Sequence, residues 1–423
     1  MTRDELKRRV DEAIERHADE IIEVGETIRR HPELGFKESR TAALVESKLR
    51  KLGLIPRTGL ALTGVRADVA GGRGSGPTFA LLGELDALVV TGHPEADAAI
   101  GLVTTKAFEH LAGRLTLMAV PAEEGGDLEW RLNEVNEGRL EFLGGKCELL
   151  RLGHLDDVDM AMMIHTTSRP EDGPTCVPGS NNGRFGKTAR FVGRAAHAGG
   201  APHMGINALY AAQIALAGIN AVRETFRDDD TIRVHPILTH GGSQVNVIPG
   251  EARLETYVRG RTLEGIRDAN AKVDRALRAG ALALGAQVEI ETLPGYLPLR
   301  TDSTLARLFR RNADALFGTG ECREAGHRAG STDMGDLSQV IPVLHPYMGG
   351  ARGTGHAADY QIVDRHLAYV TPARAMAAMA VDLLWDDAAE AREVLARAVR
   401  GMTRPAYVEF QRSVRRREVY RGV

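Results

Sequence analysis

The stretch from residue 115 to residue 126 reads LTLMAVPAEEGG, an apolar segment that ends in two adjacent carboxylates. The apolar run from Leu115 to Val120 predicts a buried strand. Pro121 and the glycines at 125–126 then enclose Glu123 and Glu124 in a turn. Adjacent side chains point in different directions, so one carboxylate can bind a metal ion while its neighbour accepts a proton from the attacking water.

Two further segments repeat this pattern of an apolar strand followed by a polar end. Residues 79–85 precede Asp86, and residues 160–164 precede His165. Helical patterns such as 102–111 separate the strands, which favours an α/β domain with a mostly parallel sheet. In such a sheet the carboxyl ends of the strands form the ligand crevice, where we expect these side chains to meet.

The start of the chain carries a helical pattern. Leu6, Val10, Ile14 and Ile21 recur at helical spacing, so the sequence predicts one long amphipathic helix that ends at the proline and glycine of residues 30–36. A second helix is predicted around 44–52. The tail after Trp385 is charged and is predicted to be helical.

The pattern changes between residues 186 and 299. A strand, a helix around 209–219, two strands, a helix around 263–277 and a final strand predict a small α+β (βαββαβ) sandwich. We therefore expect a catalytic domain built from 1–185 and 300–423, interrupted by an inserted domain over 186–299.

Composition excludes several classes of protein. The 423 residues include 54 basic and 57 acidic side chains, and aromatic residues make up only 5%, so we expect no nucleic-acid partner. No apolar run approaches the ~20 residues that span a bilayer, and the charged start lacks the apolar core of a signal peptide. Three widely spaced cysteines disfavour a disulfide framework. These features predict a cytoplasmic protein without a membrane partner.

The sequence does not match the motifs of other enzyme classes. Residues 181–188 lack the first glycine of a phosphate loop, the glycine-rich turn at 71–76 does not fit the dinucleotide fingerprint, and a Gly-x-Ser-x-Gly elbow does not occur. An isolated glutamate or histidine is usually a solvated or structural side chain. Several carboxylates and imidazoles at strand ends instead favour a divalent ion such as Zn, Mn or Co.

Several motifs, in this order along the chain, resemble the aminoacylase/carboxypeptidase family of metallohydrolases, and within it the amidohydrolases of the p-aminobenzoyl-glutamate type. The resemblance covers about residues 1–385 and implies a catalytic α/β domain with an inserted dimerisation domain, hence a homodimer or higher homo-oligomer. The motifs are HPELGF at 31–36, ELDAL at 84–88, PAEEGG at 121–126, GRAAHA at 193–198, GGSQVNVIP at 241–249 and GSTDMGD at 330–336.

The resemblance implies roles for seven side chains. Glu123 would be the general base, while Glu124, His165 and His356 would bind the metal. The remaining three lie in or beside the inserted domain. His197 would reach the active site of a partner subunit and stabilise developing negative charge, and Asn246 and Arg259 would bind polar groups or a carboxylate of the substrate. A structural salt bridge is the alternative role for Arg259.

One motif departs from the family. The amidohydrolase branch has a Gly-His-x-Cys-Gly-His run whose cysteine and second histidine bind a pair of metal ions, whereas residues 92–97 read GHPEAD. Glu95 stands for the cysteine and Asp97 for the histidine, and other branches use an aspartate there as a bridging ligand. We therefore expect Asp97 as a ligand, Glu95 as a weaker one and His93 as a possible neighbour, with one or two ions per subunit.

The predicted function is metal-dependent hydrolysis of a carbon–nitrogen bond in a small molecule. Two reactions fit. An aromatic aminohydrolase would release ammonia from an electron-poor aminobenzoate, and the altered 92–97 run, which marks a specialised member, favours it. An amidohydrolase would cleave an aryl amide or an N-acyl amino acid. A third possibility is an inactive homologue that serves as a binding subunit.

Overall fold

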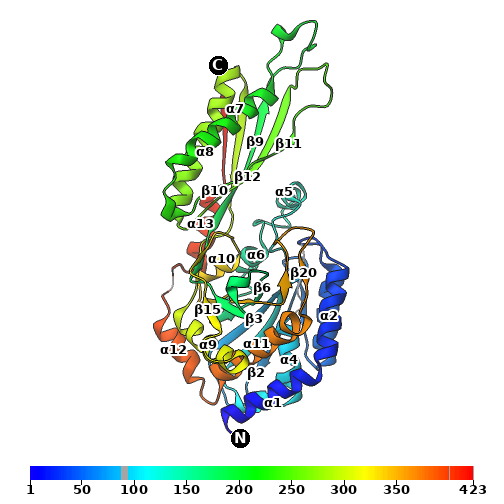
Figure 1. Ribbon diagram of the computed structural model, residues 1–423, viewed down its shortest axis with the longest axis vertical. Helices are drawn as coiled ribbons and strands as arrows, with labels where there is room; N and C mark the ends of the chain where they lie inside the picture. Colours follow the sequence, from blue (N-terminus) through cyan, green and yellow to red (C-terminus); the bar gives the residue numbers. More distant parts are fainter. Residues whose placement is uncertain (87–93, 400, 423) are drawn as a thin grey trace. The chain divides into compact units, whose positions relative to one another are not determined.

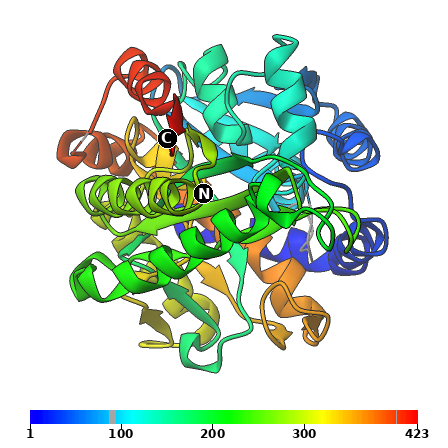
Figure 2. The same cartoon turned by 90° about the horizontal axis from the view of Figure 1, so that it is seen from above.

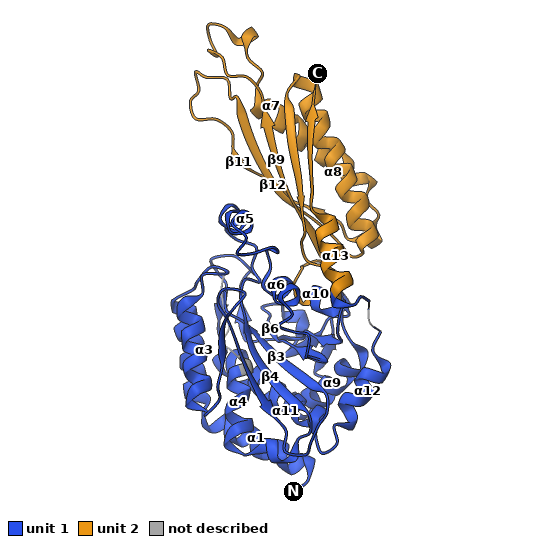
Figure 3. Ribbon diagram, turned by 180° about the vertical axis from the view of Figure 1, so that it is seen from behind, with its two compact units in different colours: residues 1–180, 300–327, 336–404 blue, residues 181–299, 328–335, 405–423 orange. Residues whose placement is uncertain are grey.

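The computed structural model describes residues 1–86, 94–399 and 401–422. The chain divides into two compact units (Figure 3). Unit 1 comprises residues 1–180, 300–327 and 336–404, and unit 2 comprises 181–299, 328–335 and 405–423. The second unit is thus inserted into the first, as the sequence predicts. The last residues of the chain differ from the expectation, because they belong to unit 2.

The centre of unit 1 is a six-stranded sheet with the order β1-β2-β4-β3-β5-β17 (Figure 1). Strands β4, β3, β5 and β17 run parallel to one another, whereas β2 runs antiparallel to β4 and β1 runs antiparallel to β2. This confirms the predicted mostly parallel sheet. The strands are β1 (Arg57–Leu60), β2 (Gly64–Ala70), β3 (Thr78–Glu84), β4 (Arg114–Val120), β5 (Met160–Met162) and β17 (Val343–Leu344).

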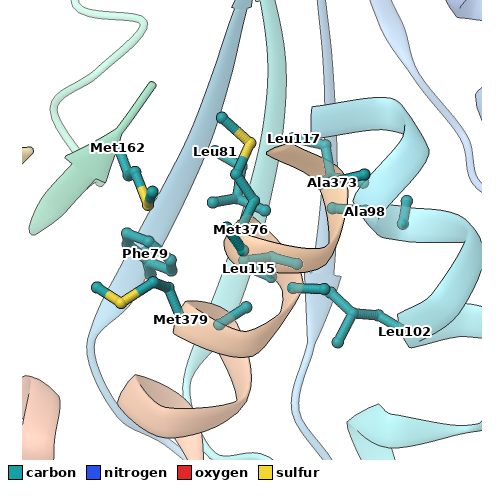
Figure 4. Packing of buried hydrophobic residues seen from close by; sticks show 14 of the residues in the cluster. Phe79, Leu81, Ala98, Leu102, Leu115, Leu117, Met162, Ala373, Met376 and Met379 are labelled. Atoms are coloured by element: carbon teal, nitrogen blue, oxygen red, sulfur yellow. The ribbon is translucent and has the colours of Figure 1, made fainter. Parts of the chain in front are cut away.

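Helices bury the sheet because apolar residues recur along one face of each. Helix α4 (Pro94–Thr104) and helix α11 (Thr371–Leu384) both contact β3, and α1 (Arg3–Arg16) packs on both helices. Figure 4 shows Leu102 and Met376 from these helices in the same apolar cluster as Phe79 and Leu115 of the sheet. The other helices of this unit are α2 (Ala18–Arg30), α3 (Ser39–Lys51), α5 (Leu128–Asn136), α6 (Gly145–Leu152), α9 (Ser303–Phe317) and α12 (Ala389–Arg397); the short α10 (Met334–Ser338) crosses the division between the units.

The predicted first helix is two helices in the structure. Helices α1 and α2 meet at His17, whose Nδ1 lies 2.8 Å from the carbonyl oxygen of Ala13. Leu6, Ile14 and Ile21 are all fully buried, so both helices turn an apolar face to the core. The continuous apolar spacing did not reveal this break.

Among the residues that the structure describes, one segment is long and apolar enough to cross a membrane. It covers His366–Leu384, 19 residues with a mean hydropathy of 1.3, of which 83% is buried inside the protein. The segment includes α11, so it is a core helix of unit 1.

The inserted segment of unit 2 forms an antiparallel sheet and the two helices α7 and α8. The strand order is β10-β12-β9-β13-β21, and β11 also pairs with β12. Helices α7 and α8 lie side by side (Figure 2, green and yellow-green). The predicted βαββαβ order is confirmed, except that three strands rather than two lie between the helices. The elements are β9 (Gly183–Val192), α7 (Ala208–Ala221), β10 (Arg233–Val234), β11 (Ile237–His240), β12 (Glu251–Gly260), α8 (Leu263–Leu284) and β13 (Gln287–Leu293).

The tail adds a strand that the sequence did not predict. After α13 (Arg404–Val414), β21 (Arg416–Arg421) pairs antiparallel with β13 over six residue pairs. The Arg278 guanidinium on α8 holds Glu418 of this strand in a bidentate ion pair, with N–O distances of 2.6 and 2.7 Å. The charged tail therefore covers one edge of the unit 2 sheet.

Candidate metal centre and active site

The turn after β4 holds Glu123 and Glu124 in a fixed conformation. Ala122 has a positive φ of 53°, which an alanine adopts only when its surroundings enforce it. Two buried carboxylates do so by accepting hydrogen bonds from successive backbone N–H groups. Glu38 binds the N–H of Ala122 at 2.8 Å, and Asp86 binds those of Glu123 and Glu124, each at 2.9 Å.

A buried arginine holds the same turn from its other side. Arg131 donates from one Nη to the carbonyl oxygen of Glu124 and from the other to the carbonyl oxygen of Leu143, at 2.5 and 2.6 Å. Gly35 leaves room for this guanidinium, since a Cβ there would lie 2.3 Å from Arg131 Nη2 and 2.8 Å from the Cα of Ala122. Gly35 of the HPELGF motif thus lets the chain pass close to this turn, where a larger residue would not fit.

The carboxylates around this turn form an acidic cluster that one lysine partly neutralises. Carboxylate oxygens of Glu84 and Glu123 lie within 4.8 Å of each other. Lys146, whose side chain is fully buried, pairs with Glu84 at 2.8 Å. Burial, and then the negative charges of Glu38 and Glu84, raise the pKa of Asp86 well above its usual range.

Glu124, His165 and His356 line one cavity of about 210 Å³, all within unit 1. His165 lies three residues after β5, beyond the carboxyl end of that parallel strand, and begins the short strand β6 (His165–Thr166), which pairs with β18 (Tyr347–Met348). His356 has a positive φ of 63° in its glycine-containing loop. The structure therefore brings together three of the side chains expected to bind metal.

The ring of His165 is oriented for ligation. Its Nδ1 lies 2.6 Å from the carbonyl oxygen of Thr166, and since only a protonated nitrogen can donate to a carbonyl, Nδ1 carries the proton. Nε2 then has a lone pair for a metal ion, the arrangement usual for a ligating histidine. One carboxylate and two imidazoles are donor types that suit Zn, Mn or Co.

Asp97 lies elsewhere. Its carboxylate on α4 pairs with the ammonium of Lys48 on α3 at 2.9 Å, and both side chains are buried. Asp97 is not among the described residues that line the cavity. His93 and the side chain of Glu95, the other expected neighbours of the metal, lie outside the described residues.

The expected residues of the inserted domain lie in unit 2. His197 is exposed, and its Nδ1 accepts hydrogen bonds from the N–H groups of Gly199 and Gly200 at 3.2 and 3.0 Å, so Nε2 carries the proton. Its next neighbour Ala198 donates a backbone hydrogen bond to the carbonyl oxygen of Asn246 at 2.9 Å. The structure thus brings these two segments together at one end of the sheet.

Arg259 is half-buried on β12. Its Nε donates to Nε2 of His235 at 3.2 Å, and Nη1 donates to the hydroxyl of Ser331 at 3.3 Å. Burial, and then the charge of Arg259, lower the pKa of His235, which favours the neutral imidazole that accepts this hydrogen bond. These contacts hold the guanidinium by hydrogen bonds to neutral side chains.

The sequence did not reveal three of the side chains that build the site, and it gave the fourth, Asp86, no role in fixing the turn. Glu38, Asp86 and Arg131 fix the turn, while Tyr360 lines the cavity and its hydroxyl lies 2.9 Å from that of Thr166. Burial raises the pKa of Tyr360, so the phenol stays protonated at neutral pH. Asp86 lies in a motif that the sequence did single out, whereas the other three carry no local pattern.

Comparison with known proteins agrees with this arrangement. Residues 179–283 match the peptidase dimerisation domain. The chain is 28% identical to Xaa-Arg dipeptidase of Mus musculus over 412 residues, 90% of each chain. It is also 28% identical to one of the subunits of p-aminobenzoyl-glutamate hydrolase of Escherichia coli over 314 residues, 70% of this chain and 63% of that relative.

Solved structures share the fold. An aminobenzoyl-glutamate utilization protein from Klebsiella pneumoniae superposes with a TM-score of 0.69 at 21% identity, covering 89% of this chain and 99% of that one. A dinuclear metal binding peptidase from Bacillus subtilis gives 0.63 at 20% identity, covering 88% and 99%. These comparisons confirm the resemblance read from the motifs, and the α/β domain with an inserted dimerisation domain.

Proposed function

Taking as premise that this chain is an enzyme homologous to hydrolases of peptide and amide bonds, we propose that it hydrolyses a carbon–nitrogen bond at the cavity of Glu124, His165 and His356. The observation that carries this proposal is that three side chains of the types that bind a divalent ion line one cavity, and that one of them, Glu124, follows Glu123 directly in the chain. An ion bound there would polarise the reacting group and lower the pKa of a water molecule.

In this proposal Glu123 is the general base. The hydrogen bonds of Asp86 fix the backbone at Glu123 and Glu124 together, so the base keeps its position relative to the ligand. Glu123 takes a proton from the attacking water and passes it to the departing nitrogen. The protonated phenol of Tyr360 can donate a hydrogen bond to negative charge that develops in the cavity.

The favoured substrate is an electron-poor aminobenzoate of the 5-nitroanthranilate type. The altered 92–97 run supports a specialised member of the family. Arg169 lies in the cavity wall, where its guanidinium pairs with Glu171 at 2.7 Å, and an aromatic carboxylate would compete with Glu171 for it. Water would add to the ring carbon that bears the amine, the carbon–nitrogen bond would break, and ammonia would leave. A hydroxyl group replaces the amine in the product.

Amide hydrolysis is the second candidate. The relatives are named for dipeptides and for p-aminobenzoyl-glutamate, whose cleavage would need the same base and ion. An inactive binding subunit is the third candidate, and the retained Glu123, Glu124, His165 and His356 argue against it. We further propose that the chain self-associates through its dimerisation domain, and that Asn246 and Arg259 bind polar groups of the substrate.

A substrate panel tests the proposal. The purified protein, loaded with Mn, Zn or Co, is incubated with 5-nitroanthranilate or with p-aminobenzoyl-glutamate, and ammonia and glutamate are measured separately. Ammonia from the first compound supports the aminohydrolase, and glutamate from the second supports the amidohydrolase. Should neither form while the Glu123→Gln variant behaves identically, the hypothesis of an inactive binding protein takes their place.

A further inference from the structure

We propose that His235 is a positioning residue for substrate binding: its neutral imidazole holds the guanidinium of Arg259 in the orientation that receives a carboxylate of the substrate, and protonation of the ring releases it. This inference rests on the proposed function, in which Arg259 binds the substrate. Both candidate substrates, an aminobenzoate and p-aminobenzoyl-glutamate, carry a carboxylate. The side chains that support the inference all belong to unit 2.

The register of two strands brings His235 to Arg259. Strand β10 pairs antiparallel with β12, and Arg233 lies opposite Arg259. His235 is two positions beyond Arg233, so it lies on the same face and is a diagonal neighbour of Arg259. Diagonal neighbours on adjacent strands are within reach of a long side chain. The strand pairing therefore places the imidazole beside the guanidinium.

Two hydrogen bonds hold the guanidinium of Arg259 at two of its nitrogens. Nε donates to Nε2 of His235 at 3.2 Å, and Nη1 donates to the hydroxyl of Ser331 at 3.3 Å. Because the guanidinium is planar, contacts at two nitrogens fix the direction in which its plane faces. A carboxylate bound by two parallel N–H···O bonds requires that plane at a set angle. His235 thus contributes directly to the geometry that such a substrate would meet.

The ring of Tyr257 supports both partners of this hydrogen bond. The imidazole of His235 meets it edge to face, with 6.0 Å between the ring centroids and 81° between the planes. The guanidinium carbon of Arg259 lies 5.6 Å from the centroid of the same ring. The buried Arg184 holds Tyr257 in turn, since its guanidinium lies 4.1 Å from that ring and 4.0 Å from the ring of Tyr296. These cation–π contacts give the pair a fixed support.

The hydrogen bond exists only while His235 is neutral, because a protonated Nε2 cannot accept. Partial burial lowers the pKa of His235, and the charge of Arg259 on β12 lowers it further. Arg184 on β9 and Arg223 in the turn Val222–Thr225 act in the same direction, and the phenol of Tyr257 faces the ring from β12. The imidazole therefore stays neutral at pH 7. In acid, protonation would remove the acceptor and place a positive charge beside Arg259.

Steady-state kinetics of the metal-loaded full chain test the inference, on whichever of 5-nitroanthranilate and p-aminobenzoyl-glutamate the parent hydrolyses. At neutral pH we expect His235→Ala to raise KM ~10-fold, with kcat changed by less than about threefold, because an orienting contact supports the bound substrate and the transition state alike. His235→Gln should keep a KM near that of the parent, since its amide oxygen can accept the same N–H.

His154→Ala is the matched control. His154 is a half-buried histidine of unit 1, and burial lowers its pKa as well, so the variant removes a similar side chain far in sequence from Arg259. We expect its KM and kcat to equal those of the parent. Circular dichroism shows that each variant is folded.

Two further measurements follow the protonation of His235. The KM of the parent should rise as the pH falls through the pKa of His235, relative to the KM of His235→Gln, which lacks this titration. NMR of the imidazole nitrogens gives a readout besides activity. In the parent Nδ1 should carry the proton, and Arg259→Met should raise the pKa of His235 towards the ordinary value of ~6.5.

An unchanged KM in His235→Ala, with an active parent, would overturn the inference and leave the proposed function intact. Equal losses in His235→Ala and His235→Gln, or a fall in kcat alone, would overturn it too, because the ring would then act through packing or in the chemical step. A pKa of His235 that is the same in Arg259→Met would show that the two side chains do not interact, with the same consequence. A parent that hydrolyses neither compound would overturn the proposed function and, with it, the inference.

Discussion

The carboxylate of Asp86 accepts hydrogen bonds from the backbone N–H groups of Glu123 and Glu124, one on each oxygen and each at 2.9 Å. A side chain at the end of β3 thus fixes the backbone at the end of β4. Because the two strands are parallel neighbours, the geometry of the base and the ligand depends on their register. Asp86 is therefore a positioning residue.

We expect Asp86→Ala to lower both metal affinity and turnover by ~10–100-fold, the usual cost of removing a group that orients a ligand. Calorimetry and steady-state kinetics measure the two effects. Asp159→Ala is a matched control, since Asp159 binds the N–H of Thr78 at the other end of β3 at 2.8 Å. A loss of the same size in the control would mean that Asp86 acts only through fold stability.

Gly35→Ala should disturb the turn from the side of Arg131. The added Cβ would lie 2.8 Å from a backbone atom of Ala122, so the turn itself must move. We expect a loss of ~1–3 kcal/mol in the free energy of unfolding together with reduced turnover. Gly126→Ala, whose Cβ would meet no atom within 4 Å, serves as the control for stability in denaturant unfolding. Equal stability of the two variants would contradict the packing argument.

The ion pairs of Glu251 should stabilise the fold at neutral pH, and this stabilisation should be lost at strongly acidic pH. Its hydrogen bond to Arg190 is the main cause that lowers its pKa to about 2, and Arg253 adds to the effect. A lowered carboxyl pKa gives stability that is present above the unfolded-state pKa of ~4.3 and is lost as the pH falls towards the folded value. The stability difference between the parent and Glu251→Gln should therefore shrink as the pH falls from ~5 to ~2, because this range spans the unfolded-state and folded-state pKa values of Glu251.

Chemical unfolding followed at several pH values measures this difference. Glu224→Gln, which changes the net charge by the same amount at an exposed position of unit 2, is the control. A Glu251→Gln difference that stays constant with pH would show that its ion pairs add no stability.

His197 is predicted to act in the active site of a partner subunit, which the exposed imidazole and the dimerisation domain permit. The variants His197→Ala and Glu123→Ala should each be inactive, yet activity should return in part when they are unfolded together and reassembled. One site of each mixed dimer would then carry both intact residues. Heterodimers without activity, identified with a tag on one variant, would assign His197 to its own subunit or to structure alone.

The sequence predicts the architecture well because strand and helix periodicity report directly on burial. The apolar run at 115–120 became β4, and the pattern at 186–299 became the two-helix sandwich of unit 2. Four of the six residues of 416–421 are charged, which concealed a strand, since β21 lies at a sheet edge, where polar side chains are tolerated.

The residues of the site could be predicted from the sequence only where they lie in a local motif. Glu123 and Glu124 follow a recognisable strand and turn, but Arg131 reaches the turn from helix α5 without any pattern of its own. For Asp97 the difficulty is physical: a buried carboxylate can bind a metal or pair with a lysine, and its partner Lys48 is 49 residues away in sequence. Only the fold reveals which neighbour it has.

The central claim is that Glu123 moves protons while Glu124, His165 and His356 hold the ion. Glu123→Gln tests it most directly, because the amide keeps the size of the side chain but cannot accept a proton. The variant should bind Co, Mn or Zn as tightly as the parent in a calorimetric titration, while its turnover on the accepted substrate falls by ~10²–10⁴-fold. Near-normal turnover with the ion bound would contradict the assignment of the base and, with it, the proposed reaction.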